Sequence, residues 1–191
     1  MFNLNAAFSR VEGSKKAIEN TQRSSARYYQ RPDNDYTELD TNRTSLSGSG
    51  GRIQIMKLNG HWNFLLATLW KTPGFETNDL GYIREADQLM NVLWAGYNQW
   101  EPKGIYNRFN INSALYTIYN FGGDLIGKGF EWHANINLKN YWNALTGGNL
   151  SGASLSTGML RGGPMMKMPG SINERIGFSS DYRKKLVFSI S

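Results

Sequence analysis

The chain has 191 residues, which suits one ordinary domain or one part of a larger protein. Charged residues make up only 19% of it and aromatic residues 13%, a composition that excludes a disordered tail. A mean hydropathy of −0.50 and the lack of an apolar run near ~18 residues exclude a transmembrane helix. They do not exclude transmembrane strands, because the hydropathies of an apolar face and a polar face average to a polar value. The absence of cysteine excludes disulfides, thiolate metal sites and cysteine nucleophiles.

Alternating apolar and polar residues predict strands along most of the chain, because successive side chains of a strand point to opposite faces. The pair Asn59-Gly60 predicts the clearest hairpin, and 101–104 and 180–184 predict two further turns. The segment 78–88 is the least strand-like and predicts one short helical turn. In chain order, the expected strands are 2–11, 23–30, 44–58, 61–71, 89–100, 105–121, 125–142, 150–161, 171–180 and 185–191.

The alternation is strictest between 130 and 139, where it separates two sets of side chains. The apolar set is Phe130, Trp132, Ala134, Ile136 and Leu138, and the polar set is Glu131, His133, Asn135, Asn137 and Lys139. In a transmembrane barrel we expect the apolar set to face lipid and the polar set to face the lumen.

Strand length, aromatic placement and loop length favour such a barrel over a soluble β-sandwich or a lipocalin-like barrel. The strands flanking 121–124 run to roughly 17 residues, against about 5–6 in globular proteins. Trp and Tyr recur near strand ends, as at Trp62 and Trp94, where lipid headgroups satisfy both the ring and its polar tip. Long connectors at 31–43 and 72–88 alternate with short turns. We therefore predict an all-β fold, an antiparallel transmembrane β-barrel.

Two loop segments carry motifs too particular for a generic strand protein. The first motif loop, 27–48, contains Arg27-Tyr28-Tyr29-Gln30-Arg31-Pro32-Asp33, then Leu39-Asp40, then Thr44-Ser45-Leu46-Ser47-Gly48. The second motif loop, 72–87, reads Thr-Pro-Gly-Phe-Glu-Thr-Asn-Asp-Leu-Gly-Tyr-Ile-Arg-Glu-Ala-Asp. In this order and spacing they resemble the C-terminal region of the domain-of-unknown-function family 5916 of Gram-negative bacteria. Thr72 stands where that family usually has Ser.

The resemblance implies a location and an architecture, but no chemistry. Members of that family resemble secreted proteins of several hundred residues, with a signal peptide and a domain like carbohydrate-binding family 9 ahead of the barrel. We therefore expect residues 1–191 to be an outer-membrane segment of a larger barrel, without that signal and that domain. Either the chain continues beyond Ser191, which we favour, or 1–11 pairs with 185–191 to close a small barrel.

Two classes of function follow. The leading one is a non-enzymatic outer-membrane barrel of a Gram-negative bacterium, acting as a channel, a receptor or an accessory subunit of an envelope transport or assembly complex. The alternative is a carbohydrate-processing outer-membrane enzyme that uses loop carboxylates at 76–87, since glycoside hydrolysis needs a pair of acids.

The expected partners follow from the same hypotheses. They are outer-membrane lipid and lipopolysaccharide, with other outer-membrane proteins, periplasmic subunits and glycan as further candidates. Basic residues are spread along the chain rather than gathered in one block, so we expect no nucleic acid.

Charged residues of the two motif loops are the candidate site, because buried charges need partners and a network of them would order the loops over the barrel mouth. The candidates are Arg27, Arg31, Asp33, Asp40, Glu76, Asp79, Arg84 and Asp87. The acids at 33–40 have calcium-like spacing but lack the glycine and the final glutamate of an EF-hand, which leaves calcium as a minor alternative. The two histidines, His61 and His133, form no zinc motif. We expect no catalytic residue, no metal site and no cofactor.

Overall fold

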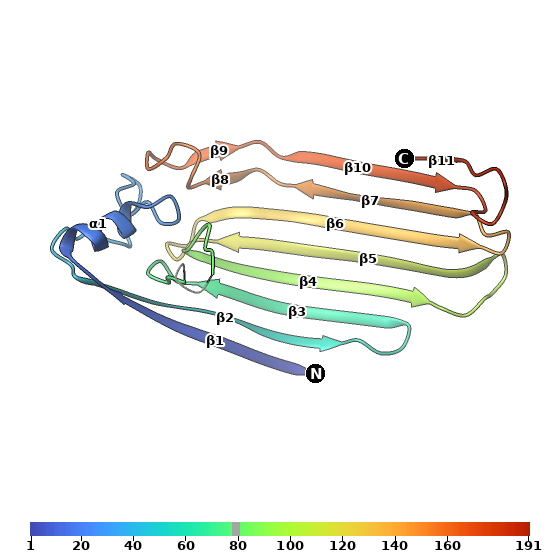
Figure 1. The fold of residues 1–191 in the computed structure, drawn as a ribbon, viewed down its shortest axis with the longest axis horizontal. Helices are drawn as coiled ribbons and strands as arrows, with labels where there is room; N and C mark the ends of the chain where they lie inside the picture. The colour runs from blue at the N-terminus through green and yellow to red at the C-terminus, as the bar shows by residue number, and fades with distance from the viewer. Residues whose placement is uncertain (78–80) are drawn as a thin grey trace.

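The computed structural model describes residues 1–77 and 81–191, which form a nine-stranded antiparallel sheet, a small two-stranded sheet and one helix (Figure 1). The elements are β1 Phe2–Glu12, α1 Lys15–Arg23, β2 Ser45–Lys57, β3 Trp62–Lys71, β4 Gln88–Gln99, β5 Tyr106–Tyr119, β6 Leu125–Leu138, β7 Asn143–Ser151, β8 Ser154–Ser156, β9 Met166–Met168, β10 Ser171–Ser179 and β11 Ser189–Ile190. The strand order of the large sheet is β1-β2-β3-β4-β5-β6-β7-β10-β11, and β8 pairs with β9. The predicted all-β antiparallel class is confirmed.

The helix α1 replaces a predicted strand, since 23–30 belongs to the end of α1 and the loop after it. The Ser14 side chain accepts a hydrogen bond from the Ala17 amide at 3.2 Å, which caps the first turn of the helix. Ile18 and Gln22, one turn apart, are its two buried residues, so the helix has one inward face. The prediction of a strand at 23–30 is therefore wrong. The cap at Ser14 and the one-turn spacing of Ile18 and Gln22 favour a helix that runs to Arg23, and the residues after it form a loop.

Four further predictions differ from the structure. The described part of 78–88 contains no helix. The predicted strand at 125–142 ends at Leu138, and the one at 150–161 is replaced by β7, which begins earlier, and by the short β8. The predicted strand at 185–191 is reduced to the two residues of β11.

The strand β7 escaped prediction because its two glycines, Gly147 and Gly148, have low strand propensity. The packing explains why glycine is needed there. A Cβ atom on Gly148 would lie 2.3 Å from the ring of Trp132 on the neighbouring strand β6, so the indole occupies the space that a side chain would fill.

The register divides the large sheet into an apolar face and a polar face. On the apolar face one transverse row of side chains crosses eight strands without a polar residue: Phe2, Ile55, Leu66, Leu93, Leu115, Phe130, Leu150 and Ile172. Most of the row is open to the surroundings, with Phe2 at 62% and Leu66 at 55% exposure. Within residues 1–77 and 81–191, no second layer covers this apolar row.

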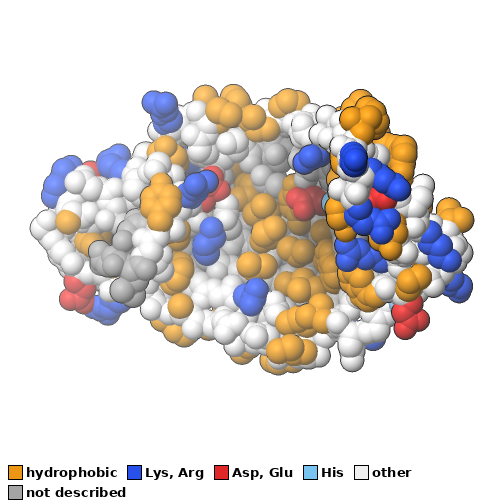
Figure 2. All heavy atoms as spheres, turned by 45° about the vertical axis from the view of Figure 1, so that its right-hand side comes forward, with side chains coloured by type: hydrophobic (Ala, Val, Ile, Leu, Met, Phe, Trp, Pro, Cys, Tyr) orange, Lys and Arg blue, Asp and Glu red, His pale blue; other side chains and the backbone are white. Residues whose placement is uncertain are grey.

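The polar face carries amides, imidazole and charge in the same register. One of its rows comprises Asn63, Gly96, Asn112, His133, Gly147 and Arg175. The predicted separation along 130–139 is confirmed over β6, because the residues at 130, 132, 134 and 136 share the face of the apolar row. Figure 2 shows a molecule that is hollowed between its two sides, with isolated charged side chains among apolar ones in the hollow.

Connections of different length gather at opposite ends of the strands (Figure 1). The loop end carries the connections 13–44, 72–87, 120–124 and 152–170. The turn end carries the connections 58–61, 100–105, 139–142 and 180–188. The short connection 120–124 is the exception at the loop end, where the others are long.

Among residues 1–77 and 81–191, buried hydrophobic residues form two small clusters, and both lie at the loop end. The first consists of Ile18, Tyr29 and Leu46, and the second of Phe75, Ile83 and Ala86. Burial raises the pKa of the Tyr29 hydroxyl to about 12, because the charged form would lose water. The conventional cores of this chain therefore support the loops rather than the sheet.

The large sheet is open at both edges. In the described chain β1 pairs with β2 alone and β11 with β10 alone, so the predicted alternative of a small barrel closed by 1–11 and 185–191 is wrong. Because neighbouring strands alternate in direction through all nine positions, β1 and β11 run the same way. Among the described helices, none has the length and apolar character needed to cross a membrane.

Candidate functional site

Arg27 joins the two motif loops at the loop end. Its guanidinium lies 2.8 Å from Glu76 Oε2 and donates a hydrogen bond to the carbonyl oxygen of Phe75. The Arg27 side chain is 1% exposed and that of Glu76 11%. A backbone hydrogen bond of 2.9 Å from the Ala86 amide to the Ala26 carbonyl lies alongside this pair. Charge-assisted hydrogen bonds shielded from water therefore fasten one motif loop to the other.

Asp87 forms a second junction, which adds a third loop. Its carboxylate accepts one hydrogen bond from the Tyr36 hydroxyl and another, of 2.9 Å, from the Phe121 amide. Tyr36 in turn accepts a hydrogen bond of 3.3 Å from Arg31. Burial of the hydroxyl and the carboxylate of Asp87 beside it raise the pKa of Tyr36. Asp87 holds a left-handed backbone with φ of 58°, a conformation that its two side-chain contacts help to maintain.

The other two acidic candidates of the first motif loop differ in what they contact. Asp33 accepts a hydrogen bond of 2.5 Å from the Met165 amide, and its second oxygen lies 3.7 Å from Arg31 Nε. It therefore connects the first motif loop with the connection that precedes β10. Asp40 lies apart from these contacts, with its carboxylate 3.9 Å from Arg43 Nε near the surface.

The remaining candidates are outside this group of contacts or outside the described residues. Arg84 is exposed. Asp79 lies between the described ranges 1–77 and 81–191, so the structure says nothing of it. Of the predicted residues, the structure thus brings together Arg27 with Glu76, Arg31 with Asp33, and Arg31 with Asp87 through Tyr36.

The described carboxylates of 76–87 all have structural partners. Glu76 pairs with Arg27, Glu85 accepts a hydrogen bond from Gln88, and Asp87 accepts the two described above. A glycosidase pair needs two carboxyl groups facing a common open space, and these three are instead directed at loop contacts. The described residues contain no group of three or more His, Asp or Glu side chains that could hold a metal ion.

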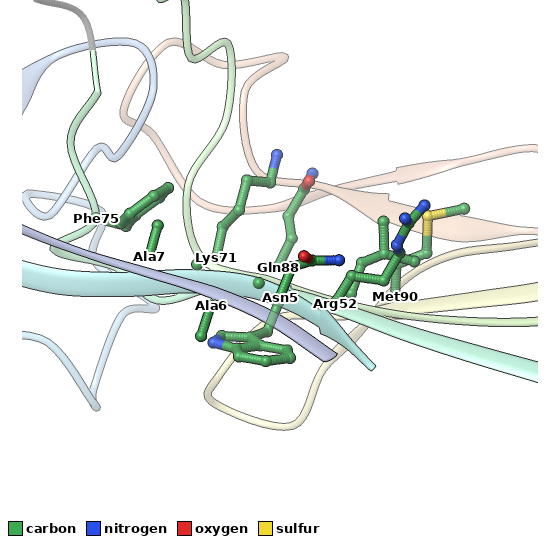
Figure 3. Close-up of a pocket in the computed structure, with 12 residues that line it drawn as sticks. Asn5, Ala6, Ala7, Arg52, Lys71, Phe75, Gln88 and Met90 are labelled. Carbon is green, nitrogen blue, oxygen red and sulfur yellow. The ribbon is translucent and has the colours of Figure 1, made fainter. Parts of the chain in front are cut away.

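A cavity of about 570 Å³ opens on the polar face near the loop end, between β1 and β4 (Figure 3). Arg52, Lys71, Gln88 and Met90 rise from one side of the sheet, the side on which Phe75 also lies. The volume of the cavity falls within the range of about 300–1,000 Å³ that is usual for small-molecule pockets. We call it the Arg52–Lys71 cavity.

Glycine lets the second motif loop approach the strand beside this cavity. A Cβ atom on Gly50, which faces the polar side, would lie 2.6 Å from the ring of Phe75, so the ring packs directly on the backbone of β2. Sequence reasoning missed the cavity, although a run of small residues at 47–51 directly before Arg52 could have indicated a close approach to the strand.

A second cavity, of about 490 Å³, lies toward the turn end of the polar face. Its lining includes Asn63, Asn98, Asn112 and Trp94. The register places Trp94 opposite Ala114 on the polar face, so the expectation that this indole joins the aromatic rings at the lipid boundary is wrong. The sequence of β4 carries no period-two signal that could have placed it, because apolar residues stand in both phases, with Leu93 on the apolar face and Val92 on the same face as Trp94.

The comparisons with known proteins give one match. A family model described as a domain of unknown function, DUF5916, matches residues 8–191. No curated protein matches the chain, and no solved structure does.

Proposed function

This chain belongs to the DUF5916 family, and we propose that it forms part of the wall of an outer-membrane β-barrel of a Gram-negative bacterium, acting as a channel or receptor for solutes. In this proposal the apolar face contacts lipid, the polar face lines the lumen, and further strands complete the barrel. No catalytic step is assigned to this segment.

The uncovered apolar row carries the proposal. Eight apolar side chains lie side by side across eight strands, and a soluble sheet would bury such a row under a second layer. Fully burying a Leu, Ile or Phe side chain is worth roughly 1.5–3 kcal/mol, so leaving the row in water would be strongly unfavourable. A bilayer supplies the missing apolar contact.

Aromatic rings near the turn end support the same orientation. Trp62 contacts Tyr97 with ring centres 4.9 Å apart, Tyr97 contacts Phe109 at 5.7 Å, and Trp142 contacts Phe178 at 4.9 Å. Rings of Trp and Tyr are favoured at the depth of lipid headgroups, where the apolar ring and the polar tip both find suitable surroundings. A belt of this kind would mark the membrane boundary at the turn end.

The two ends and the polar face also suit a barrel wall. Outer-membrane barrels have short turns on the periplasmic side and longer loops outside, which corresponds to the turn end and the loop end here. Asn and Arg side chains of the polar face, such as Asn112 and Arg175, would be hydrated in a water-filled lumen. The joined motif loops would then lie at the outer mouth, in the path of an arriving solute.

Cysteine labelling of adjacent residues tests the proposal, and the absence of native cysteine makes each variant a single probe. Ala134→Cys lies on the apolar face and Asn135→Cys on the polar face of β6. In lipid vesicles we expect a water-soluble maleimide to label position 135 and to spare position 134, while both react after denaturation. Labelling of position 134 at the rate of position 135, or failure of the protein to enter vesicles, would show that the proposal is wrong.

A further inference from the structure

The Arg52–Lys71 cavity places two cations side by side on the polar face. Arg52 lies in a row with Asn5, Leu69 and Met90, and Lys71 lies one row nearer the loop end, opposite Gly50. Diagonal neighbours of this kind on adjacent strands have Cα atoms about 7–8 Å apart, within reach of long side chains. Both can therefore approach one bound group.

The two cationic groups are not held by close protein contacts in the described ranges, and the Glu85 carboxylate acts on the charge of Lys71 only from beyond ion-pair distance. Within 1–77 and 81–191, no hydrogen bond and no ion pair involves the Arg52 guanidinium or the Lys71 ammonium. By contrast, Arg27 and Arg183 each pair with a nearby carboxylate. The neighbouring side-chain amide of Gln88 donates a hydrogen bond to the Glu85 carboxylate and forms none with either cation.

Apolar side chains complete the cavity beside the cations. Leu69 and Met90 extend from β3 and β4, and the ring of Phe75 lies over Gly50. Phe75 is 8% exposed and belongs to a buried cluster, so this apolar wall is fixed by the second motif loop. A ligand would meet charge on one side and hydrocarbon on the other.

We propose that the Arg52–Lys71 cavity binds small amphipathic anions, which carry a carboxylate, phosphate or sulfate group on an apolar body. Guanidinium and ammonium groups donate charge-assisted hydrogen bonds to such oxygens, and the apolar wall accepts the body of the ligand. The inference rests on the proposed function, because it names the class of solute that the lumen face would receive.

Equilibrium dialysis of the detergent-solubilised protein against 2-naphthoate tests this inference, with neutral 2-naphthylmethanol as the uncharged analogue. We expect naphthoate to bind at least tenfold more tightly than the alcohol. We expect Arg52→Gln and Lys71→Gln each to weaken naphthoate binding about tenfold and to leave the alcohol unaffected. Arg175→Gln, which removes an exposed arginine from a distant part of the same face, should change neither affinity.

Inorganic phosphate, added as a competitor, separates the two parts of the ligand. We expect it to displace naphthoate only at much higher concentration, because it lacks the apolar body. Equal binding of acid and alcohol, no effect of either glutamine variant, or displacement by phosphate at the concentration of naphthoate would overturn the inference. Dialysis needs no bilayer, so a failure here is distinct from a failure of the labelling at positions 134 and 135.

Discussion

The loop end and the sheet of this protein are stabilised in different ways. At the loop end, side chains such as Arg27 and Asp87 are buried and each contacts particular partners. In the sheet, the apolar row repeats one simple pattern and leaves its side chains exposed. The loop end therefore has the organisation of a water-soluble core, whereas the apolar row of the sheet is left uncovered by the described residues. Substitutions in the two regions should differ in their effect and in what that effect depends on.

The largest effect is expected from Arg27→Met, which retains apolar volume but removes the guanidinium between the motif loops. Breaking a buried ion pair typically costs roughly 3–5 kcal/mol. We expect the loss to appear as faster hydrogen exchange of the loop amides, in detergent and in lipid alike. Arg10→Gln is the control, because its pair with Glu12 is exposed and worth at most about 1 kcal/mol. Equal effects of the two substitutions would contradict the description of the loop end as a buried core.

The next effect depends on the bilayer. Ala134→Arg introduces a charge on the apolar face, which costs about 2–4 kcal/mol at the midplane of a membrane, and Asn135→Arg introduces the same charge on the polar face. Urea unfolding in lipid vesicles should show this loss for position 134 and little change for position 135. A cost at position 135 that equals the cost at position 134 would remove the distinction between the faces.

A smaller effect is expected from packing within the sheet. Gly148→Ala would place a Cβ atom 2.3 Å from the Trp132 ring and 2.4 Å from the carbonyl oxygen of Asn173. Overpacking of this kind costs typically about 1–3 kcal/mol. Gly147→Ala meets its nearest neighbour at 3.2 Å and should cost less. Unfolding free energies and the near-ultraviolet signal of tryptophan compare the two variants, and a Gly147→Ala loss as large as that of Gly148→Ala would argue against the proposed role of the indole.

The smallest effect concerns the pH dependence of one turn. Arg183 donates two hydrogen bonds of 2.9 Å to the Asp181 carboxylate, which lowers the pKa of Asp181 to about 2. This contribution is present above the ordinary aspartate pKa and is lost as the pH falls toward about 2. The protection factors of the amides in the turn 180–188, which correct for the intrinsic pH dependence of exchange, should therefore fall between pH 4 and 2. In Arg183→Gln the protection factors should be lower at neutral pH and should change less on acidification, and an unchanged profile would exclude this pair as the cause.

The sheet was largely predictable from the sequence, since the alternation that defines a strand also defines its faces. The alternation between Phe130 and Lys139 predicted which β6 residues from 130 onward share a face, and Asn59-Gly60 predicted the turn between β2 and β3. The boundaries of β7 were not predictable in the same way. Its glycines weaken the local pattern, and they are explained only by Trp132 on the adjacent strand.

The loop end was less predictable, because its contacts join residues far apart in the chain. Charge alone identified Arg27 and Glu76 as candidates, but their pairing depends on how two loops fold together. Tyr36 was not a candidate, although it connects Arg31 with Asp87, because a single tyrosine in a polar loop carries no pattern. The Arg52–Lys71 cavity likewise requires knowledge of which residues of β2 and β3 are opposite each other.

The shared direction of β1 and β11 restricts how the sheet can become a closed cylinder. In an entirely antiparallel cylinder the number of strands is even, so nine strands require an odd number of additional ones. Two copies of this sheet inserted with the same orientation would meet edge to edge with their strands parallel, and so cannot close such a cylinder by themselves. In the proposed barrel, the completing element would have to present a strand of opposite direction to each edge, which would make strand parity a means of recognising it.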